Sequence, residues 1–125
     1  MLRFKPAFIT ALGWSLMVSF LLCLPGQEFP KMTWLGKIWF DKWVHISLFL
    51  AIVIFWCRAF SNKYPGKLKT LFGRIALLSI IYGVVMEFVQ HFFIPFRSFE
   101  FLDIVADGIG SLAGYLISLR WYIKK

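Results

Sequence analysis

Seven side chains able to bind ligands or transfer protons lie within residues 87–114, a stretch that is otherwise rich in phenylalanine. They are Glu87, Gln90, His91, Arg97, Glu100, Asp103 and Asp107. The stretch holds four of the chain's six acidic residues, although the whole chain has a formal net charge of +8. Carboxylates in apolar surroundings are costly unless they are paired or hydrogen-bonded. These residues therefore predict either an ion-paired network or a site that binds a charged group or transfers protons.

The spacing of the polar residues places them on three helix faces. The residues that share a face are Asp41 with His45, Glu87 with Gln90 and His91, and Asp103 with Asp107. Residues three or four positions apart are neighbours on a helix surface. Small residues extend two of these faces, namely Ser79 and Gly83 before Glu87, and Gly110 and Gly114 after Asp107. Because small residues in lipid mark helix faces that pack against other helices, we expect the three polar faces to converge.

The elements that must hold these residues are membrane-spanning helices. The chain is 60% hydrophobic and 16% charged, whereas soluble domains are about 45–50% apolar and about 25% charged. Its 125 residues leave room for about four spans of roughly 20 residues each. Apolar runs predict spans at residues 6–24, 43–60, 71–93 and 101–122, with a small-residue packing face at Ala11, Ser15 and Ser19 in the first. We therefore predict one domain, residues 1–125, that is an all-α, polytopic four-transmembrane-helix bundle.

The distribution of charge predicts the orientation of this bundle. Ten Lys and Arg residues and no acid flank the N-terminus, the loop between the second and third spans, and the C-terminus. The other two loops and their flanks carry four Lys or Arg residues and all six acids. The excess of basic residues predicts that both termini are cytoplasmic. Since the basic residues separate apolar runs and form no soluble basic face, nucleic acid is not expected as a partner.

Glu87 and Asp107 fall inside predicted spans, where an ionisable residue indicates a functional site by default. An Asp that faces lipid at the centre of a span costs up to about 2.5–3.5 kcal/mol. Pairing with Lys42, Arg97 or His45, or opening to a water-filled cleft, would remove this cost. Arg97 is the obvious clamp because its guanidinium can bind two carboxylate oxygens or a phosphate.

Three of these residues, His45, Glu87 and Asp103, are candidates for proton transfer. The predicted binding residues are Asp41, Lys42, His45, Glu87, Gln90, Arg97, Asp103 and Asp107. No nucleophilic Ser or Cys accompanies them at the same depth, so covalent catalysis is unsupported and enzymatic activity stays open.

Two alternatives give these residues other roles. A metal centre would draw on His45, Glu87, His91 and Asp103, but no compact ligand motif such as H-E-x-x-H occurs, so neither a metal nor a cofactor is assigned. In a non-enzymatic module the ion pairs would only lock the bundle or recruit a partner.

Three motifs together resemble the VanZ-like family of small bacterial membrane proteins. They are Asp41-Lys42-x-x-His45, Glu87-x-x-Gln90, and Arg97 followed by Asp103-x-x-x-Asp107-x-x-Gly110. The resemblance covers residues 41–114 and departs from the family's pattern at Asp107, where the family usually has Asn. A carboxylate at this position either adds a charge or is held neutral by burial beside other acids.

The resemblance implies a multi-pass protein of the bacterial cytoplasmic (inner) membrane that acts at or near the cell envelope. The family's namesake is associated with resistance to the glycopeptide teicoplanin. We therefore expect the lipid bilayer as a partner, and an outward-facing polar cluster that binds or modifies an envelope phospholipid or lipid-linked precursor.

Overall fold

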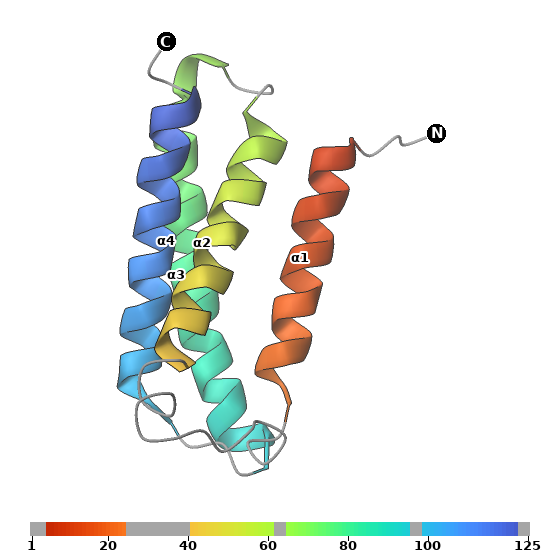
Figure 1. Ribbon diagram of the computed structural model, residues 1–125, viewed down its shortest axis with the longest axis vertical. Coiled ribbons are helices and arrows are strands. Elements are labelled where there is room, and N and C mark those ends of the chain that lie inside the picture. Colours follow the sequence, from red (N-terminus) through yellow and green to blue (C-terminus); the bar gives the residue numbers. More distant parts are fainter. Residues whose placement is uncertain (1–4, 25–40, 62–64, 96–98, 123–125) are drawn as a thin grey trace.

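The protein is a bundle of long helices, as the sequence predicts. The computed structural model describes residues 5–24, 41–61, 65–95 and 99–122. These residues form α1 (Pro6–Leu22), α2 (Asp41–Phe60), the short 3-10 turn η3 (Pro65–Lys67), α3 (Leu68–Phe93) and α4 (Phe101–Tyr122), and they contain no strand. The helices run side by side, with α1 at one flank (Figure 1).

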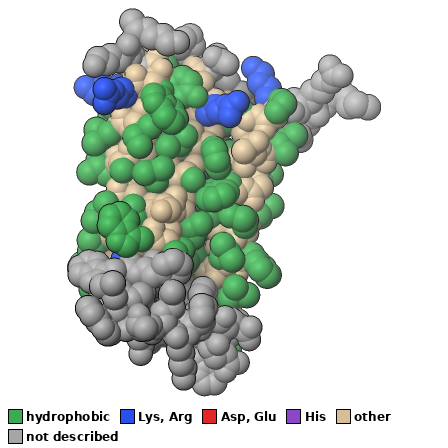
Figure 2. Space-filling view, in the orientation of Figure 1, with side chains coloured by type: hydrophobic (Ala, Val, Ile, Leu, Met, Phe, Trp, Pro, Cys, Tyr) green, Lys and Arg blue, Asp and Glu red, His purple; other side chains and the backbone are tan. Residues whose placement is uncertain are grey.

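Three of the helices are long and apolar enough to cross a membrane. The candidate spans are Lys42–Phe60, Leu68–Phe93 and Phe101–Tyr122. Large apolar side chains such as Leu16, Phe20 and Phe93 are exposed, and hydrophobic side chains cover much of the face in Figure 2. α1 has 17 residues, which is at the lower limit of about 17–25 for a spanning helix. The chain is therefore of membrane type, and the first of the four predicted spans stays a prediction.

The closest helix pair is α2 with α4, because α4 presents glycines to the backbone of α2. A Cβ atom added to Gly110 would lie 2.3 Å from the carbonyl oxygen of Ile46, and one added to Gly114 would lie 2.8 Å from that of Leu50. Only a residue without a side chain allows this approach. The prediction that these glycines serve helix packing is confirmed.

The small-residue face of α1 packs against α2 and α3. Ala11 is fully buried, and the Ser15 hydroxyl accepts a hydrogen bond from Trp56 Nε1 at 2.8 Å. Ser19 shares a hydrogen bond of 2.5 Å with the Tyr82 hydroxyl. This predicted packing face is also confirmed.

Charged side chains separate to the two ends of the bundle. The basic end, where α1 begins and α4 ends (Figure 1), carries six exposed basic side chains: Lys5, Arg58, Lys67, Lys69, Arg74 and Arg120. Figure 2 shows Lys and Arg side chains at this end. The acidic end, where α3 ends and α4 begins, carries every acidic side chain that the structure describes: Glu87, Glu100, Asp103 and Asp107. Which end faces the cytoplasm stays a prediction.

Candidate functional site

The polar cluster at the acidic end consists of Lys42, His45, Glu87, Glu100, Asp103 and Asp107. Helix starts and ends bring these residues together: the first two lie in the opening turns of α2, Glu87 lies near the end of α3, and the others lie just before or within the start of α4. The helices meet there because Gly83 and Gly110 remove side chains from the contacts between them. A Cβ on Gly83 would lie 2.7 Å from Asp107 Oδ2.

Lys42 joins α2 to the start of α4 through two acids. Its ammonium donates to Glu100 Oε2 at 2.5 Å and to Asp103 Oδ1. The Glu100 side chain is 48% exposed, while that of Asp103 is 9% exposed. Lys42 therefore lies between an acid at the surface and an acid in the interior of the bundle.

His45 lies one turn deeper, between the two aspartates of α4. Its Nδ1 is 2.8 Å from Asp107 Oδ1, and its Nε2 is 3.7 Å from Asp103 Oδ2. An ionised carboxylate only accepts hydrogen bonds, so Nδ1 carries a proton when Asp107 is charged. The imidazole is thus oriented with Nε2 toward Asp103, at a distance longer than a hydrogen bond.

Glu87 is 1% exposed and connects α3 to the start of α4. Its Oε1 accepts a hydrogen bond of 2.6 Å from the backbone N–H of Glu100. This backbone donor offsets part of the cost of burying a carboxyl group. The pairing expected for Glu87 was with Lys42, His45 or Arg97, and the observed partner is instead a backbone group at the start of the next helix.

Glu100 was not among the predicted site residues, although it lies in the polar stretch. Its position three residues before Asp103, at the start of a helix, was the available signal. The Glu100 carbonyl accepts from the Asp103 backbone N–H at 3.1 Å, which begins the hydrogen bonding of α4. The residue therefore contributes a backbone donor to Glu87 and a side-chain acceptor to Lys42.

Gln90 and His91 lie outside the cluster, although both follow Glu87 on α3. The Gln90 amide nitrogen donates to the Leu22 carbonyl oxygen at 2.8 Å, which joins α3 to the end of α1. His91 is exposed, and its ring packs edge-on against Phe92 and Phe99 with centroid distances of 4.7 and 6.1 Å.

Two further predicted residues fall partly or wholly outside the described part of the chain. Arg97 is outside it altogether. Asp41 begins α2, but its side chain is outside the described set. Their predicted binding roles stay predictions.

The cluster forms a graded path from the surface into the bundle. Side-chain exposure falls from 48% at Glu100 to 16% at Lys42, 9% at Asp103 and 3% at Asp107. Among the described residues, no three His, Cys, Asp or Glu side chains are placed to hold a metal ion. The described contacts of the cluster are ion pairs and hydrogen bonds.

Comparison with models of protein families gives a match over nearly the whole chain. The family model described as VanZ/LLP1 matches residues 4–122. No curated protein and no solved structure matches the chain.

Proposed function

The chain belongs to the VanZ/LLP1 family, and we propose that it is a membrane protein whose polar cluster binds the head group of an envelope lipid or lipid-linked precursor. The observation that carries this proposal is the graded exposure of the cluster. A head group at the membrane surface meets Glu100 and Lys42 first, while Asp103, His45 and Asp107 extend inward from them.

The balance of charge favours a head group that brings hydrogen-bond donors. Among the described side chains, the cluster holds four carboxyl groups and one ammonium, so acid is in excess among them whether or not His45 is protonated. The sequence assigns six acids and four Lys or Arg residues to the same end, so the net charge predicted for that end is also negative. A primary ammonium complements this end because it carries a positive charge and three N–H donors.

Modification of the bound lipid is the further part of the proposal. Asp107 orients His45 through Nδ1, which leaves Nε2 beside Asp103 to accept or donate a proton. Glu87 is held close by through the backbone of Glu100. His45, Glu87 and Asp103 therefore remain the candidates for acid–base chemistry.

The test compares two lipids that differ only in the head-group amine. Phosphatidylethanolamine and phosphatidylcholine with the same acyl chains are added to the purified protein in micelles, and retained lipid is counted by native mass spectrometry. Because hydrogen bonds to charged groups contribute about 1.5–3 kcal/mol, we expect about tenfold preference for phosphatidylethanolamine. Asp103→Asn and Glu100→Gln should abolish the preference, whereas Arg120→Gln at the basic end should leave it unchanged.

A second candidate function is a non-enzymatic module in which the cluster only locks the helices together. The observation in its favour is that Lys42 and His45 already contact two carboxylates each. It predicts equal retention of the two lipids, together with a lower unfolding temperature for Asp103→Asn. That pair of results would replace the lipid-binding proposal.

Orientation and a role in glycopeptide resistance are proposed on the charge distribution and the family resemblance. With both termini cytoplasmic, the polar cluster faces outward. A single cysteine placed at Lys69 should react with a membrane-impermeant maleimide only after cells are opened. Expression in a susceptible bacterium should raise the teicoplanin concentration that prevents growth, and Asp103→Asn should remove that increase.

A further inference from the structure

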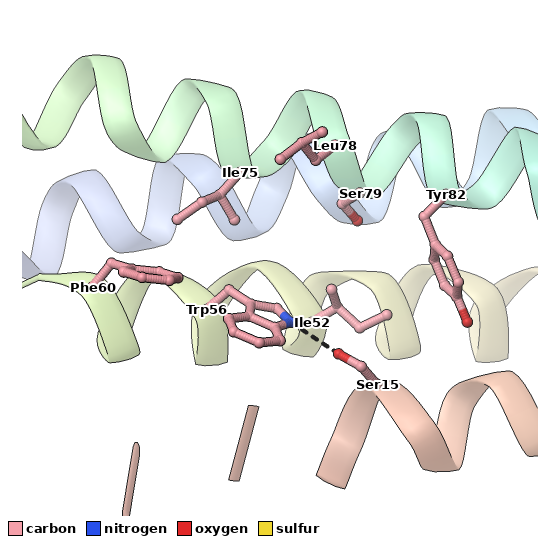
Figure 3. A pocket seen from close by; sticks show the side chains of 8 residues that line it. All are labelled: Ser15, Ile52, Trp56, Phe60, Ile75, Leu78, Ser79 and Tyr82. Atoms are coloured by element: carbon pink, nitrogen blue, oxygen red, sulfur yellow. Dashed lines mark hydrogen bonds between the residues drawn. The ribbon is translucent and has the colours of Figure 1, made fainter. Parts of the chain in front are cut away.

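A pocket of about 370 Å³ lies between α1, α2 and α3, and none of its lining residues belongs to the polar cluster. Figure 3 shows its walls: Ser15 from α1, a row of Ile52, Trp56 and Phe60 along α2, and side chains of α3 that include Leu78 and Tyr82. Its volume is at the lower end of the range of about 300–1,000 Å³ for small-molecule pockets. The space therefore suits one slender ligand.

The pocket runs from the middle of the bundle toward the basic end. Ile52 lies near the middle of α2 and Phe60 is its last residue, eight positions that span about 12 Å at 1.5 Å per residue. Toward the acidic end, α1 and α3 are tied together by the Ser19–Tyr82 and Gln90–Leu22 hydrogen bonds. Leu78, on the wall formed by α3, is 64% exposed, so the pocket borders the lipid-facing surface.

The polar atoms around the pocket already have partners. Trp56 Nε1 donates to the Ser15 hydroxyl at 2.8 Å, and the Ser79 hydroxyl pairs with that of Ser111 at 2.8 Å. The Tyr82 hydroxyl pairs with Ser19. The remaining wall is aliphatic and aromatic, so the surface offers dispersion contacts and apolar burial. Hydrocarbon fits this lining, and a polar head group does not.

Phe60 lines one end of the pocket, and basic side chains lie beyond that end. Arg74 precedes Leu78 by four residues and Tyr82 by eight, so the three share one stripe of α3. Arg74 is exposed at the basic end, where the described side chains include six Lys or Arg residues and no acid. Most of the Lys and Arg surface visible in Figure 2 lies at this end.

We propose that the pocket holds one acyl chain of an anionic phospholipid whose phosphate lies beside Arg74. The chain fills the apolar groove, and the head group reaches the basic end, where Lys and Arg residues near a membrane surface attract anionic lipids. The head group of this lipid lies at the opposite end from the polar cluster, and its binding does not depend on the function proposed for that cluster.

The test measures retention of phosphatidylglycerol and of phosphatidylcholine with the same acyl chains, by native mass spectrometry of the purified protein. The wild-type protein should retain about tenfold more phosphatidylglycerol, since each nearby Lys or Arg increases anionic lipid binding about fivefold. Leu78→Trp should fill the pocket and lower retention of both lipids about tenfold. Arg74→Gln should lower retention of phosphatidylglycerol about fivefold and leave phosphatidylcholine unchanged.

Matched controls separate the pocket from the general lipid surface. Leu77→Trp changes an exposed neighbour that does not line the pocket, and Arg120→Gln removes a basic residue on α4. Both should stay within about twofold of wild type. Equal retention of the two lipids by the wild-type protein overturns the proposal, whether or not Leu78→Trp folds. Equal losses in the Leu78 and Leu77 variants overturn it as well.

Discussion

The contact between Gly110 and Ile46 sets the spacing of α2 and α4, so Gly110→Ala should separate these helices. The added Cβ would lie 2.3 Å from the Ile46 carbonyl oxygen and 3.0 Å from its carbonyl carbon. Ordinary contacts between carbon and carbonyl oxygen begin at about 3.3 Å, so the helices must move apart by roughly 1 Å. Neither partner is a flexible side chain that can turn aside.

Moving α2 away from α4 should lower the stability of the bundle and lengthen a contact within the polar cluster. Overpacking costs typically about 1–3 kcal/mol, and a backbone contact belongs at the upper end. A loss of about 3 kcal/mol corresponds to a fall in unfolding temperature of roughly 10 °C for a chain of this size. The same movement would stretch the 2.8 Å contact between His45 and Asp107 beyond about 3.2 Å, the usual limit of a hydrogen bond.

The assay uses a cysteine that the chain already carries. Cys57 is fully buried on α2, so a fluorogenic maleimide reports unfolding when its thiol becomes accessible. Cys23→Ala leaves Cys57 as the one thiol, because the chain has two cysteines. Protein in micelles is heated with the reagent, and the temperature of half-maximal labelling is compared between variants.

Gly108→Ala is the matched control, two positions away on the same helix. A Cβ at Gly108 has no atom within 4 Å, and alanine favours a helix over glycine by about 1 kcal/mol. This variant should unfold at the wild-type temperature or slightly above it. If Gly110→Ala and Gly108→Ala unfold at the same temperature, the argument that backbone contact sets the helix spacing is refuted.

Substitutions at three further contacts are tested by the same labelling assay. Gly83→Ala should lower the unfolding temperature by several degrees, because its Cβ would lie 2.7 Å from Asp107 Oδ2 and 3.0 Å from Asp107 Cβ. Asp107→Asn keeps an acceptor 2.8 Å from His45 and should change stability by less than about 1 kcal/mol, whereas Asp107→Ala should lose about 1–3 kcal/mol. Ser79→Ala and Ser111→Ala should each cost about 1 kcal/mol, and the double variant should cost less than their sum because the two hydroxyls pair only with each other across this contact.

Each of these changes has its own control or contradicting outcome. Gly73→Ala adds a methyl group whose nearest neighbour is a Tyr115 ring carbon at 3.8 Å, an ordinary contact, so it should be neutral where Gly83→Ala is not. Equal losses for Asp107→Asn and Asp107→Ala would show that the charge of this residue, and not its hydrogen bond, stabilises the bundle. Strict additivity of the two serine substitutions would contradict the pairing of their hydroxyls.

Periodicity was sufficient to predict that the polar faces of α2 and α4 meet. The 3.6-residue repeat of a helix places His45 on the polar face of α2 and Asp107 on the polar face of α4. The small residues beside Asp107 indicate that its face packs closely against another helix. Those two patterns predicted that the polar faces converge, and the 2.8 Å contact between His45 and Asp107 confirms this for the faces of α2 and α4. This much follows from local geometry alone.

The individual partners could not be predicted, because they depend on how helix ends meet in space. Glu87 pairs with the backbone N–H of Glu100, and Gln90 pairs with the Leu22 carbonyl. Backbone groups carry no sequence signature, so neither partner is visible in the pattern of side chains. The apolar pocket was missed for a related reason. It forms between α1, α2 and α3, and the spacing of residues along one helix does not encode the distance between helices.

The hydrogen bond between Gln90 and Leu22 has a consequence for the order in which the bundle is assembled. The last carbonyl groups of a helix lack partners within that helix, and in lipid each unsatisfied group costs several kcal/mol. Leu22 is the last residue of α1, and its carbonyl receives the Gln90 side chain from 68 positions later in the chain. During synthesis from the N-terminus, α1 therefore emerges before the Gln90 side chain that contacts its last residue. We therefore expect the end of α1 to reach its final position against α3 only after α3 has been made, although α1 is made first.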